Sequence, residues 1–411
     1  MAETLLNAEG RRSGASLGRG WFAIVVMVLA ASAVMLVTDV VVNWPLAPTL
    51  HNIGGKWTGR DFVAFWAASD LALHGQAAQA YDVARIHSAE ISIVGESAKQ
   101  LAWTYPPPTL LLVSPLALLP YPAALAVWLL LPLVGLALLL RRLAPHPLTP
   151  WLVPLFTGIS QSLGIGQNGV LSALMLGAGL LALERRPLLA GCCFGLLACK
   201  PQLALLVGPA LLVGGHYRAL AAMAGMVLTL ALASWIAFGT SAWQGFFDML
   251  PVATDWLASG RVPYVLMTTV FAASRLAGLS AAGAYALQWL STIGALVVVV
   301  WIWRRPHPLW LRGSALAAAI PMATPYAYSY DLALLCLPIA WLAWDVLTRG
   351  WRRFDSAVLM LTWLAPSAGW LLAVCTNILV TPLVLALLLA AIIRRALEQR
   401  ELVATAGAVA P

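Results

Sequence analysis

Charge is scarce in this 411-residue sequence: charged residues make up 10% of it, and only 16 residues are acidic. Soluble globular proteins carry roughly a quarter charged residues, so this composition excludes an ordinary soluble domain. Hydrophobic residues make up 61% and the mean hydropathy is +0.86. Because a backbone in lipid must satisfy its own hydrogen bonds, continuous apolar runs of this kind predict an all-α, polytopic membrane protein.

A helix needs roughly 20 residues to span the hydrocarbon core, and several of the apolar runs are shorter, so we expect ten to twelve crossings. The first run follows three arginines as a signal peptide would, but its length and the lack of a small-residue cleavage site predict a retained helix. The expected helices cover residues 21–42, 107–120, 122–140, 151–165, 169–183, 188–214, 219–239, 282–303, 313–328, 331–347, 356–374 and 377–393.

The net charge of +8 comes mainly from arginines in short connections, such as Arg141-Arg142 and Arg304-Arg305. The positive-inside bias places these connections and both termini in the cytoplasm, so the basic balance indicates topology and not nucleic-acid binding. One alternative stays open. Either residues 107–120 are a short re-entrant piece, or Arg141-Arg142 break the charge rule.

The chain is expected to form one integral domain, because no soluble module or long linker divides it. We expect a cytoplasmic segment at 1–20, a membrane domain at 21–400 and a disordered tail at 401–411. Two loops outside the cytoplasm, 43–106 and 240–280, have room for a site. The expected location is the bacterial inner (plasma) membrane, with the site facing outward.

Cysteine and histidine are also sparse. The five cysteines fall inside apolar runs, and the six histidines are scattered without ligand spacing, so neither a disulfide framework nor a metal site is indicated. Paired carboxylates at ligand spacing are not evident, and no glycine-rich phosphate cradle is present. We therefore expect no cofactor, a metal-independent site and no nucleotide donor.

The first outer loop contains Gly59-Arg60-Asp61-Phe62 and ends in Tyr105-Pro106. Phe62, Phe65, Trp66 and Leu73 predict an amphipathic helix along the membrane surface, with Asp61 at its start. Aspartate is among the best N-capping residues, so Asp61 is either a cap or a functional acid. The adjacent Arg60 and the rigid prolines after Tyr105 favour the functional interpretation.

These motifs together resemble those of glycosyltransferase family 87. The likeness includes the Gly-Arg-Asp-Phe stretch, Tyr81-Asp82, Tyr105-Pro106-Pro107 and Ser114-Pro115-Leu116-Ala117. It continues through Gly166-Gln167-Asn168, Lys200-Pro201-Gln202, Thr324-Pro325 and Tyr330-Asp331-Leu332, from about residue 60 to 340. The last region carries Tyr326, Tyr328 and Tyr330 where mannosyltransferases of the family tend to carry histidine.

The resemblance implies a GT-C fold and transfer of a sugar, mannose or another hexose or pentose, from a polyprenyl-phosphate donor. The acceptor would be a hydroxyl of a glycolipid or glycan outside the cytoplasm, with inversion. The family's acid in the first outer loop corresponds to Asp61, which would act as general base. This agrees with the chemistry, because an alcohol must lose its proton as the new bond forms.

A leaving lipid phosphate needs a cation or fixed donors. Lys200, in an apolar run where a charge is costly, is the first candidate, although it could instead snorkel from a helix end. Arg60 and Arg261 are alternatives. Gln167 and Asn168 either bind sugar hydroxyls or form an ordinary turn. For Asp331 three roles are open: it holds the acceptor, holds a lysine or caps a helix. Gln202 is a candidate because it belongs to the Lys200-Pro201-Gln202 motif. Trp66, Trp103, Tyr105 and Tyr330 either stack on sugar or belong to the interfacial aromatic belt.

Two other classes of protein fit some of these features. A transporter or flippase of lipid-linked sugars would explain the helices and Lys200, although inverted repeats and broken helices are not evident. A non-catalytic membrane subunit would need Asp61 only as a cap. Membrane lipids are expected partners in every case.

Overall fold

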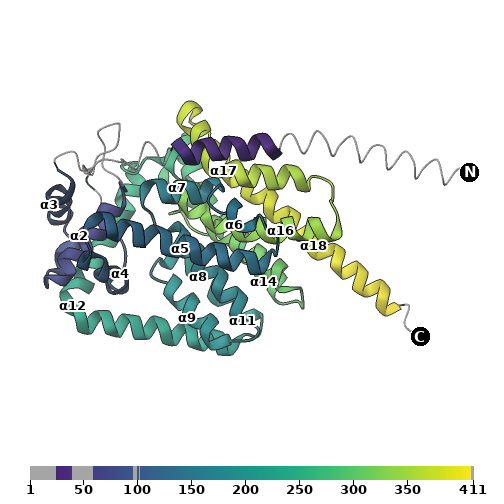
Figure 1. The fold of residues 1–411 in the computed structure, drawn as a ribbon, viewed down its shortest axis with the longest axis horizontal. Coiled ribbons are helices and arrows are strands. Elements are labelled where there is room, and N and C mark those ends of the chain that lie inside the picture. Colours follow the sequence, from purple (N-terminus) through teal and green to yellow (C-terminus); the bar gives the residue numbers. More distant parts are fainter. Residues whose placement is uncertain (1–24, 39–58, 96–99, 101, 409–411) are drawn as a thin grey trace, which may run out of the picture.

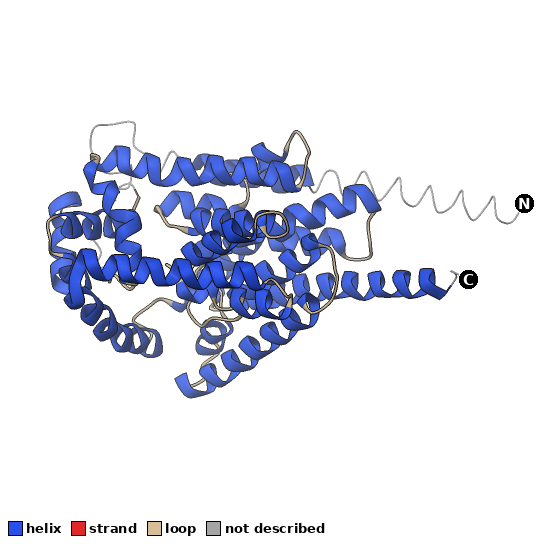
Figure 2. Cartoon of the chain, turned by 90° about the horizontal axis from the view of Figure 1, so that it is seen from below, coloured by secondary structure: helices blue, strands red, loops and turns tan. Residues whose placement is uncertain are grey.

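The structure is a computed structural model and describes residues 25–38, 59–95, 100 and 102–408. The described chain is almost entirely helical, and its one β-bridge joins Met267 to Tyr328 (Figures 1 and 2). This confirms the all-α fold class. The expected segment 1–20 lies outside the described residues.

Five described helices are long and apolar enough to cross a membrane, and seven apolar helices are shorter. The long set contains α5 (Tyr121–Leu143), α12 (Tyr217–Ser259), α14 (Ala281–Trp303), the segment Ser329–Arg349 and α17 (Asp355–Thr376). Exposed Trp289, Leu290 and Ile293 on α14 are typical of a helix that faces lipid. An integral membrane protein is confirmed, and the number of ten to twelve crossings stays a prediction.

The first described helix is Val25–Thr38. The first outer loop then forms α2, η1 and α3, and the chain returns through two short helices before α5. Their bounds are α2 Phe62–Leu73, η1 Ala77–Tyr81, α3 Val83–Val94, α4 Pro107–Val113 and η2 Ser114–Leu118. Nine of the twelve residues of α2 are buried, so the expectation of an amphipathic surface helix is wrong. This helix is a core element, packed against η1, α3, α4 and η2.

The segment 107–120 does not cross the molecule. It is split into α4 and η2, which pack on α2, and Ser69 Oγ of α2 donates to the carbonyl oxygen of Val113 at 2.7 Å. α5 begins beside α2, where Tyr121 OH donates to the Gly59 carbonyl at 3.2 Å. At 1.5 Å per residue, its 23 residues carry Arg141 and Arg142 roughly 30 Å away. This geometry matches the re-entrant alternative.

The middle of the chain is more broken than its apolar pattern indicates. The expected helix 188–214 consists of three pieces. The first break falls before Pro201, because proline cannot continue the preceding helical hydrogen bonds. The pieces in this region are α6 Thr149–Leu152, α7 Thr157–Ile165, α8 Gly169–Ala182, α9 Pro187–Leu197, α10 Pro201–Ala204 and α11 Val207–Val213. Lys200 therefore lies at a helix break, directly before α10, and not within a continuous helix.

The second expected loop, 240–280, is largely helical. α12 continues through it to Ser259 after a sharp break at Gly239, whose φ is 74°. η3 (Tyr264–Leu266) and α13 (Val270–Leu276) then lead to α14. The backbone of Thr268 donates to the Ala327 carbonyl at 3.0 Å, which ties this connection to the tyrosine-rich segment 326–330.

The C-terminal part begins with α15 (Leu309–Ala319) and η4 (Ile320–Met322), which end earlier than the expected helix 313–328. It continues through η5 (Ser329–Leu335), α16 (Cys336–Arg349), α17 and α18 (Thr381–Ala408). α18 runs on to Ala408, so it enters the segment 401–411 for which disorder was expected. Figure 1 shows α2, α3 and α4 at one end of the long axis and the end of α18 at the other.

Candidate functional site

Asp61 stands at the start of α2, but its side chain does not cap the helix. Its carboxylate Oδ2 instead accepts from Gln167 Nε2 at 3.0 Å, and its backbone N–H donates to the Ile165 carbonyl at 2.8 Å. The side chain is half-buried. Capping is therefore excluded as the reason for this aspartate, since a cap would accept from the N–H groups of the first turn.

Gln167 and Asn168 are held in place by the turn between α7 and α8. Gly166 ends α7 in the left-handed conformation, with φ 81°, which favours glycine. Its carbonyl accepts from Trp128 Nε1 at 3.1 Å, and the Gln167 carbonyl accepts from Ser162 Oγ at 3.0 Å. The two expected roles of this segment are thus compatible: it is a turn, and it presents two amide side chains.

These amides connect Asp61 to a second buried acid. Tyr105 OH donates to Gln167 Oε1 at 3.4 Å and accepts from Asn168 Nδ2 at 3.2 Å. Lys200 Nζ donates to Asn168 Oδ1 at 3.2 Å and forms an ion pair with Asp331. We call Asp61, Gln167, Tyr105, Asn168, Lys200 and Asp331 the polar network.

The Lys200–Asp331 pair of the polar network also contacts the tyrosine-rich segment 326–330. Asp331 is fully buried and its Oδ2 accepts the backbone N–H of Tyr328 at 3.0 Å. The Lys200 ammonium lies 4.8 Å from the centre of the Tyr330 ring, where the face of the ring attracts a cation. Of the roles expected for Asp331, the geometry shows two: Oδ1 holds a lysine, and Oδ2 caps the start of η5 by accepting from the backbone of its N-cap residue.

Burial, followed by the nearby carboxylates of Asp331 and Asp61, raises the pKa of Tyr105 well above its usual value. The phenol therefore stays protonated at physiological pH. This matters because Tyr105 OH must donate to Gln167 while it accepts from Asn168.

Aromatic rings surround the network. The rings of Tyr328 and Tyr330 stack with centres 5.3 Å apart, and Tyr326 meets Tyr328 edge-on at 5.4 Å. On the other side Trp103 and Phe65 lie 5.0 and 5.2 Å from Tyr105. Aromatic faces and charged or amide groups together suit a polyhydroxylated ligand.

Other expected residues make their contacts elsewhere. Trp66 Nε1 donates to the Leu119 carbonyl at 3.2 Å, and the exposed Arg261 lies over the ring of Trp256 at 4.7 Å. Gln202 is half-buried in α10, and Arg60 is half-buried beside Asp61. Sequence reasoning missed Trp128 and Tyr121, which hold the Gly166 and Gly59 carbonyls. Both are aromatic residues with a polar group inside an apolar run, and this pattern could have identified them as candidates.

The described residues contain no group of three or more His, Cys, Asp or Glu side chains placed to hold a metal ion. Metal independence stays a prediction. A cavity of about 1000 Å³ is present, but none of the polar network lines it.

The fold and the buried polar network define an all-helical integral membrane protein whose site can hold a polar ligand. A model of glycosyltransferase family 87 matches residues 103–325. The match covers more than half of the chain, so the chain belongs to this family and is a membrane glycosyltransferase, which acts on a sugar donor and an acceptor. No curated protein and no solved structure matches it.

The family prediction is thereby confirmed. The matched residues include Tyr105, Gln167, Asn168 and Lys200, whereas Asp61 and Asp331 lie outside them. The similarity to mannosyltransferases in particular stays a prediction.

Proposed function

We propose that this glycosyltransferase moves a sugar from a polyprenyl-phosphate donor to a hydroxyl of a glycolipid or glycan on the extracytoplasmic side. The acceptor O–H gives its proton to the Asp61 carboxylate and its oxygen bonds to the anomeric carbon. The bond from that carbon to the phosphate oxygen breaks, and the electron pair leaves with the lipid phosphate. Attack from the opposite face inverts the anomeric centre.

One observation carries this proposal: the Asp61 carboxylate is held by Gln167 Nε2 and does not cap its own helix. A general base must be oriented toward the proton that it accepts. The amide donor of Gln167 supports this orientation at Oδ2, and Gln167 is in turn held by a hydrogen bond from Tyr105.

The leaving phosphate requires positive charge or fixed donors. Lys200 already has the Asp331 carboxylate as partner, so the pair adds little net charge. We assign the role of phosphate partner to Arg60, because it is the neighbour of Asp61 in the sequence. To the Lys200–Asp331 pair we assign the task of positioning Asn168 and Tyr105.

The remaining binding roles follow from position. Tyr105 and Tyr330 are proposed to contact the sugar ring, and Gln167 and Asn168 its hydroxyls. A lipid-borne donor fits a sequence without a glycine-rich nucleotide cradle. No step requires a cofactor, and we expect transfer to persist in a chelator.

The test is an assay with membranes, a radiolabelled polyprenyl-phosphate sugar and a lipid extract as acceptor source. Asp61→Asn keeps the hydrogen bond from Gln167 within reach but removes the base, so transfer should fall by roughly 10²-fold or more. Asp70→Asn is the matched control, because Asp70 lies on the same helix with its side chain 39% exposed. Transfer by Asp61→Asn at the control's rate would reject the general-base role.

The same assay addresses the flippase alternative. Movement of intact carrier across the membrane, with no change in its glycosylation, would favour transport over transfer. Family membership and the oriented carboxylate both favour transfer.

A further inference from the structure

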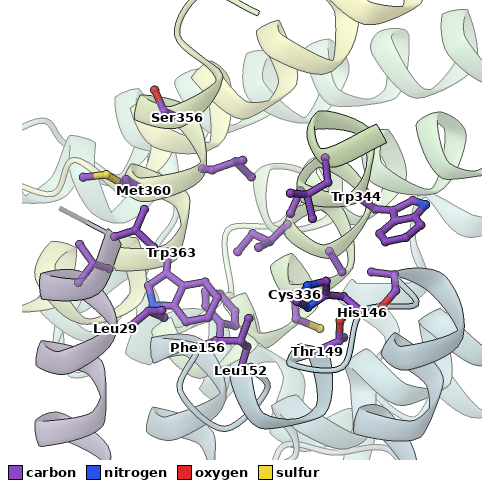
Figure 3. A pocket seen from close by; sticks show the side chains of 18 of the residues that line it. Leu29, His146, Thr149, Leu152, Phe156, Cys336, Trp344, Ser356, Met360 and Trp363 are labelled. Carbon is purple, nitrogen blue, oxygen red and sulfur yellow. Dashed lines mark hydrogen bonds between the residues drawn. The ribbon is translucent and has the colours of Figure 1, made fainter. Parts of the chain in front are cut away.

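The cavity of about 1000 Å³ lies between the helix Val25–Thr38, the end of α5, α6, α16 and α17. Its volume is at the upper end of the roughly 300–1,000 Å³ of ligand pockets. Figure 3 shows Leu29, Phe156, Leu152 and Trp363 gathered on one side of it. This wall offers apolar and aromatic surface to an occupant.

The cavity is closed on one side by the helix Val25–Thr38. Ser32, which is buried, accepts from Trp363 Nε1 of α17 at 3.0 Å. Leu29 and Val25 of the same helix line the cavity, as does Trp363. An occupant would therefore contact the first described helix and α17 at once.

Part of the cavity lining is basic. Arg352 and Arg353 line it, and Arg352 is already paired with Asp345 and Glu398. Arg353 is exposed, and its guanidinium lies 4.5 Å from the centre of the Phe354 ring. Among the described residues no carboxylate lies within ion-pair distance of Arg353, so its charge is available to a ligand.

Trp344, Trp351 and His146 also line the cavity, and Figure 3 shows His146, Thr149 and Cys336 close together. Tryptophans of this kind gather at the level of lipid headgroups. The end of α5 with Arg141 and Arg142 is also here, since Leu140, Ala144 and His146 line the cavity. The cavity lining is thus mainly apolar and aromatic, with two arginines in it, of which Arg353 is exposed.

We propose that this cavity binds an anionic glycerophospholipid, with its acyl chains among Leu29, Phe156 and Trp363 and its phosphate at Arg353. Arginine-rich connections face the cytoplasm, and the cytoplasmic leaflet carries the anionic lipids that attract them. An apolar body with one available cation at its rim matches this ligand in both shape and charge.

The donor's polyprenyl chain fits this cavity less well. None of the polar network lines the cavity, and the part of α5 that does line it is at Leu140, near the end of this helix that is far from α2. A donor anchored here would hold its phosphate away from Asp61. The proposed lipid instead joins the helix Val25–Thr38 to α17 and stabilises their packing.

The test uses the full-length protein, purified in detergent and freed of lipid. Binding is measured by native mass spectrometry and by thermal unfolding, with phosphatidylglycerol and phosphatidylcholine of identical acyl chains. Phosphatidylglycerol should bind more tightly and raise the melting temperature more. Arg353→Gln should weaken its binding about fivefold, which corresponds to about 1 kcal/mol per arginine near a surface, and should leave phosphatidylcholine unaffected.

Arg304→Gln is the matched control, because Arg304 is exposed in another arginine-rich connection and does not line the cavity. Ala340→Phe fills the cavity and should abolish the stabilisation by phosphatidylglycerol. If Ala340→Phe does not fold, the comparison of Arg353→Gln with Arg304→Gln still tests whether the lipid phosphate binds at Arg353. Three results would overturn the proposal. Arg353→Gln and Arg304→Gln could lose the same amount of phosphatidylglycerol binding, the two phospholipids could bind equally, or polyprenyl phosphate could displace phosphatidylglycerol.

Discussion

Lys200 and Asp331 form a buried ion pair across 131 positions of the sequence. The pair joins the break between α9 and α10 to η5, and it is the point where the polar network meets the tyrosine segment. Breaking a buried pair leaves one charge without its partner, which costs about 3–5 kcal/mol.

We therefore expect Asp331→Asn or Lys200→Met alone to destabilise the protein by about 3–5 kcal/mol. The double variant Lys200→Met/Asp331→Asn should recover most of the stability, because no unpaired charge remains. Thermal unfolding in detergent measures this. Losses that simply add in the double variant would show that the two side chains do not act as a pair.

A second prediction concerns Gly169, the first residue of α8. A Cβ atom there would lie 2.1 Å from the Tyr330 carbonyl oxygen, which belongs to the backbone and cannot rotate away. Gly169→Ala should destabilise the protein by about 1–3 kcal/mol and reduce transfer, because it pushes α8 from the tyrosine segment.

Gly208→Ala is its control, because a Cβ atom at Gly208 of α11 meets nothing within 4 Å. That change should be neutral or stabilise by up to about 1 kcal/mol. Equal melting temperatures for the two variants would contradict the close approach.

The arginine end of the molecule contains a buried ionic cluster on α16, α17 and α18. Arg395 is 1% exposed and donates to Asp345 at 3.0 Å and to Asp355 at 2.7 and 3.0 Å. Arg395→Met removes the one buried cation of this cluster and leaves Asp345 and Asp355 with the more exposed Arg349, Arg352 and Arg394, so we expect a loss of up to about 3–5 kcal/mol.

Arg349→Gln tests whether burial, and not ion pairing as such, sets this cost. Arg349 also pairs with Asp345, at 3.1 Å, but its side chain is 52% exposed. Exposed pairs contribute about 0–1 kcal/mol. A comparable loss in the two variants, measured by thermal unfolding, would refute the distinction.

His216 gives a prediction for pH. Burial, followed by the nearby Arg312 guanidinium, lowers the pKa of His216 below its usual 6.5, and Arg312 Nη1 lies 3.1 Å from His216 Nε2. The unfolded chain then takes up this proton more readily than the folded one, so stability should decrease as pH falls below about 6.5. His216→Gln should flatten that decrease in melting temperature between pH 8 and 5.

His74→Gln is the control, because His74 is exposed at the end of α2 with its side chain 70% accessible. It should leave the pH dependence as in the parent protein. An unchanged dependence in His216→Gln would assign the effect to other groups.

The sequence was most informative where composition alone decides structure. Apolar runs predicted α5, α8 and α14 to within two or three residues, and short motifs predicted the family. Lys200-Pro201 was interpreted as part of one helix, because a single proline does not reveal where a helix stops inside an apolar run. The amphipathic surface helix at α2 was wrong because its partners, α4 and η2, come from a segment expected to lie in the membrane.

All six residues of the polar network were predicted as candidate site residues, but the contacts between them were not. Asp61 and Gln167 are 106 positions apart, and Lys200 and Asn168 are 32 apart. Local patterns carry no information on which amide faces which acid, since that depends on how α7, α8 and η5 pack. The sequence indicated Lys200 as a candidate partner for the leaving phosphate, a role that stays a prediction, but it did not show that Asp331 forms an ion pair with it.

The contact between Ser32 and Trp363 spans 331 positions and has a consequence for biosynthesis. The helix Val25–Thr38 is synthesised long before α17, so it enters the bilayer before the helix that it packs against exists. The hydrogen bond between Ser32 and Trp363 can form only after α17 has been inserted. Packing of the first described helix against α17 is therefore a late step of folding.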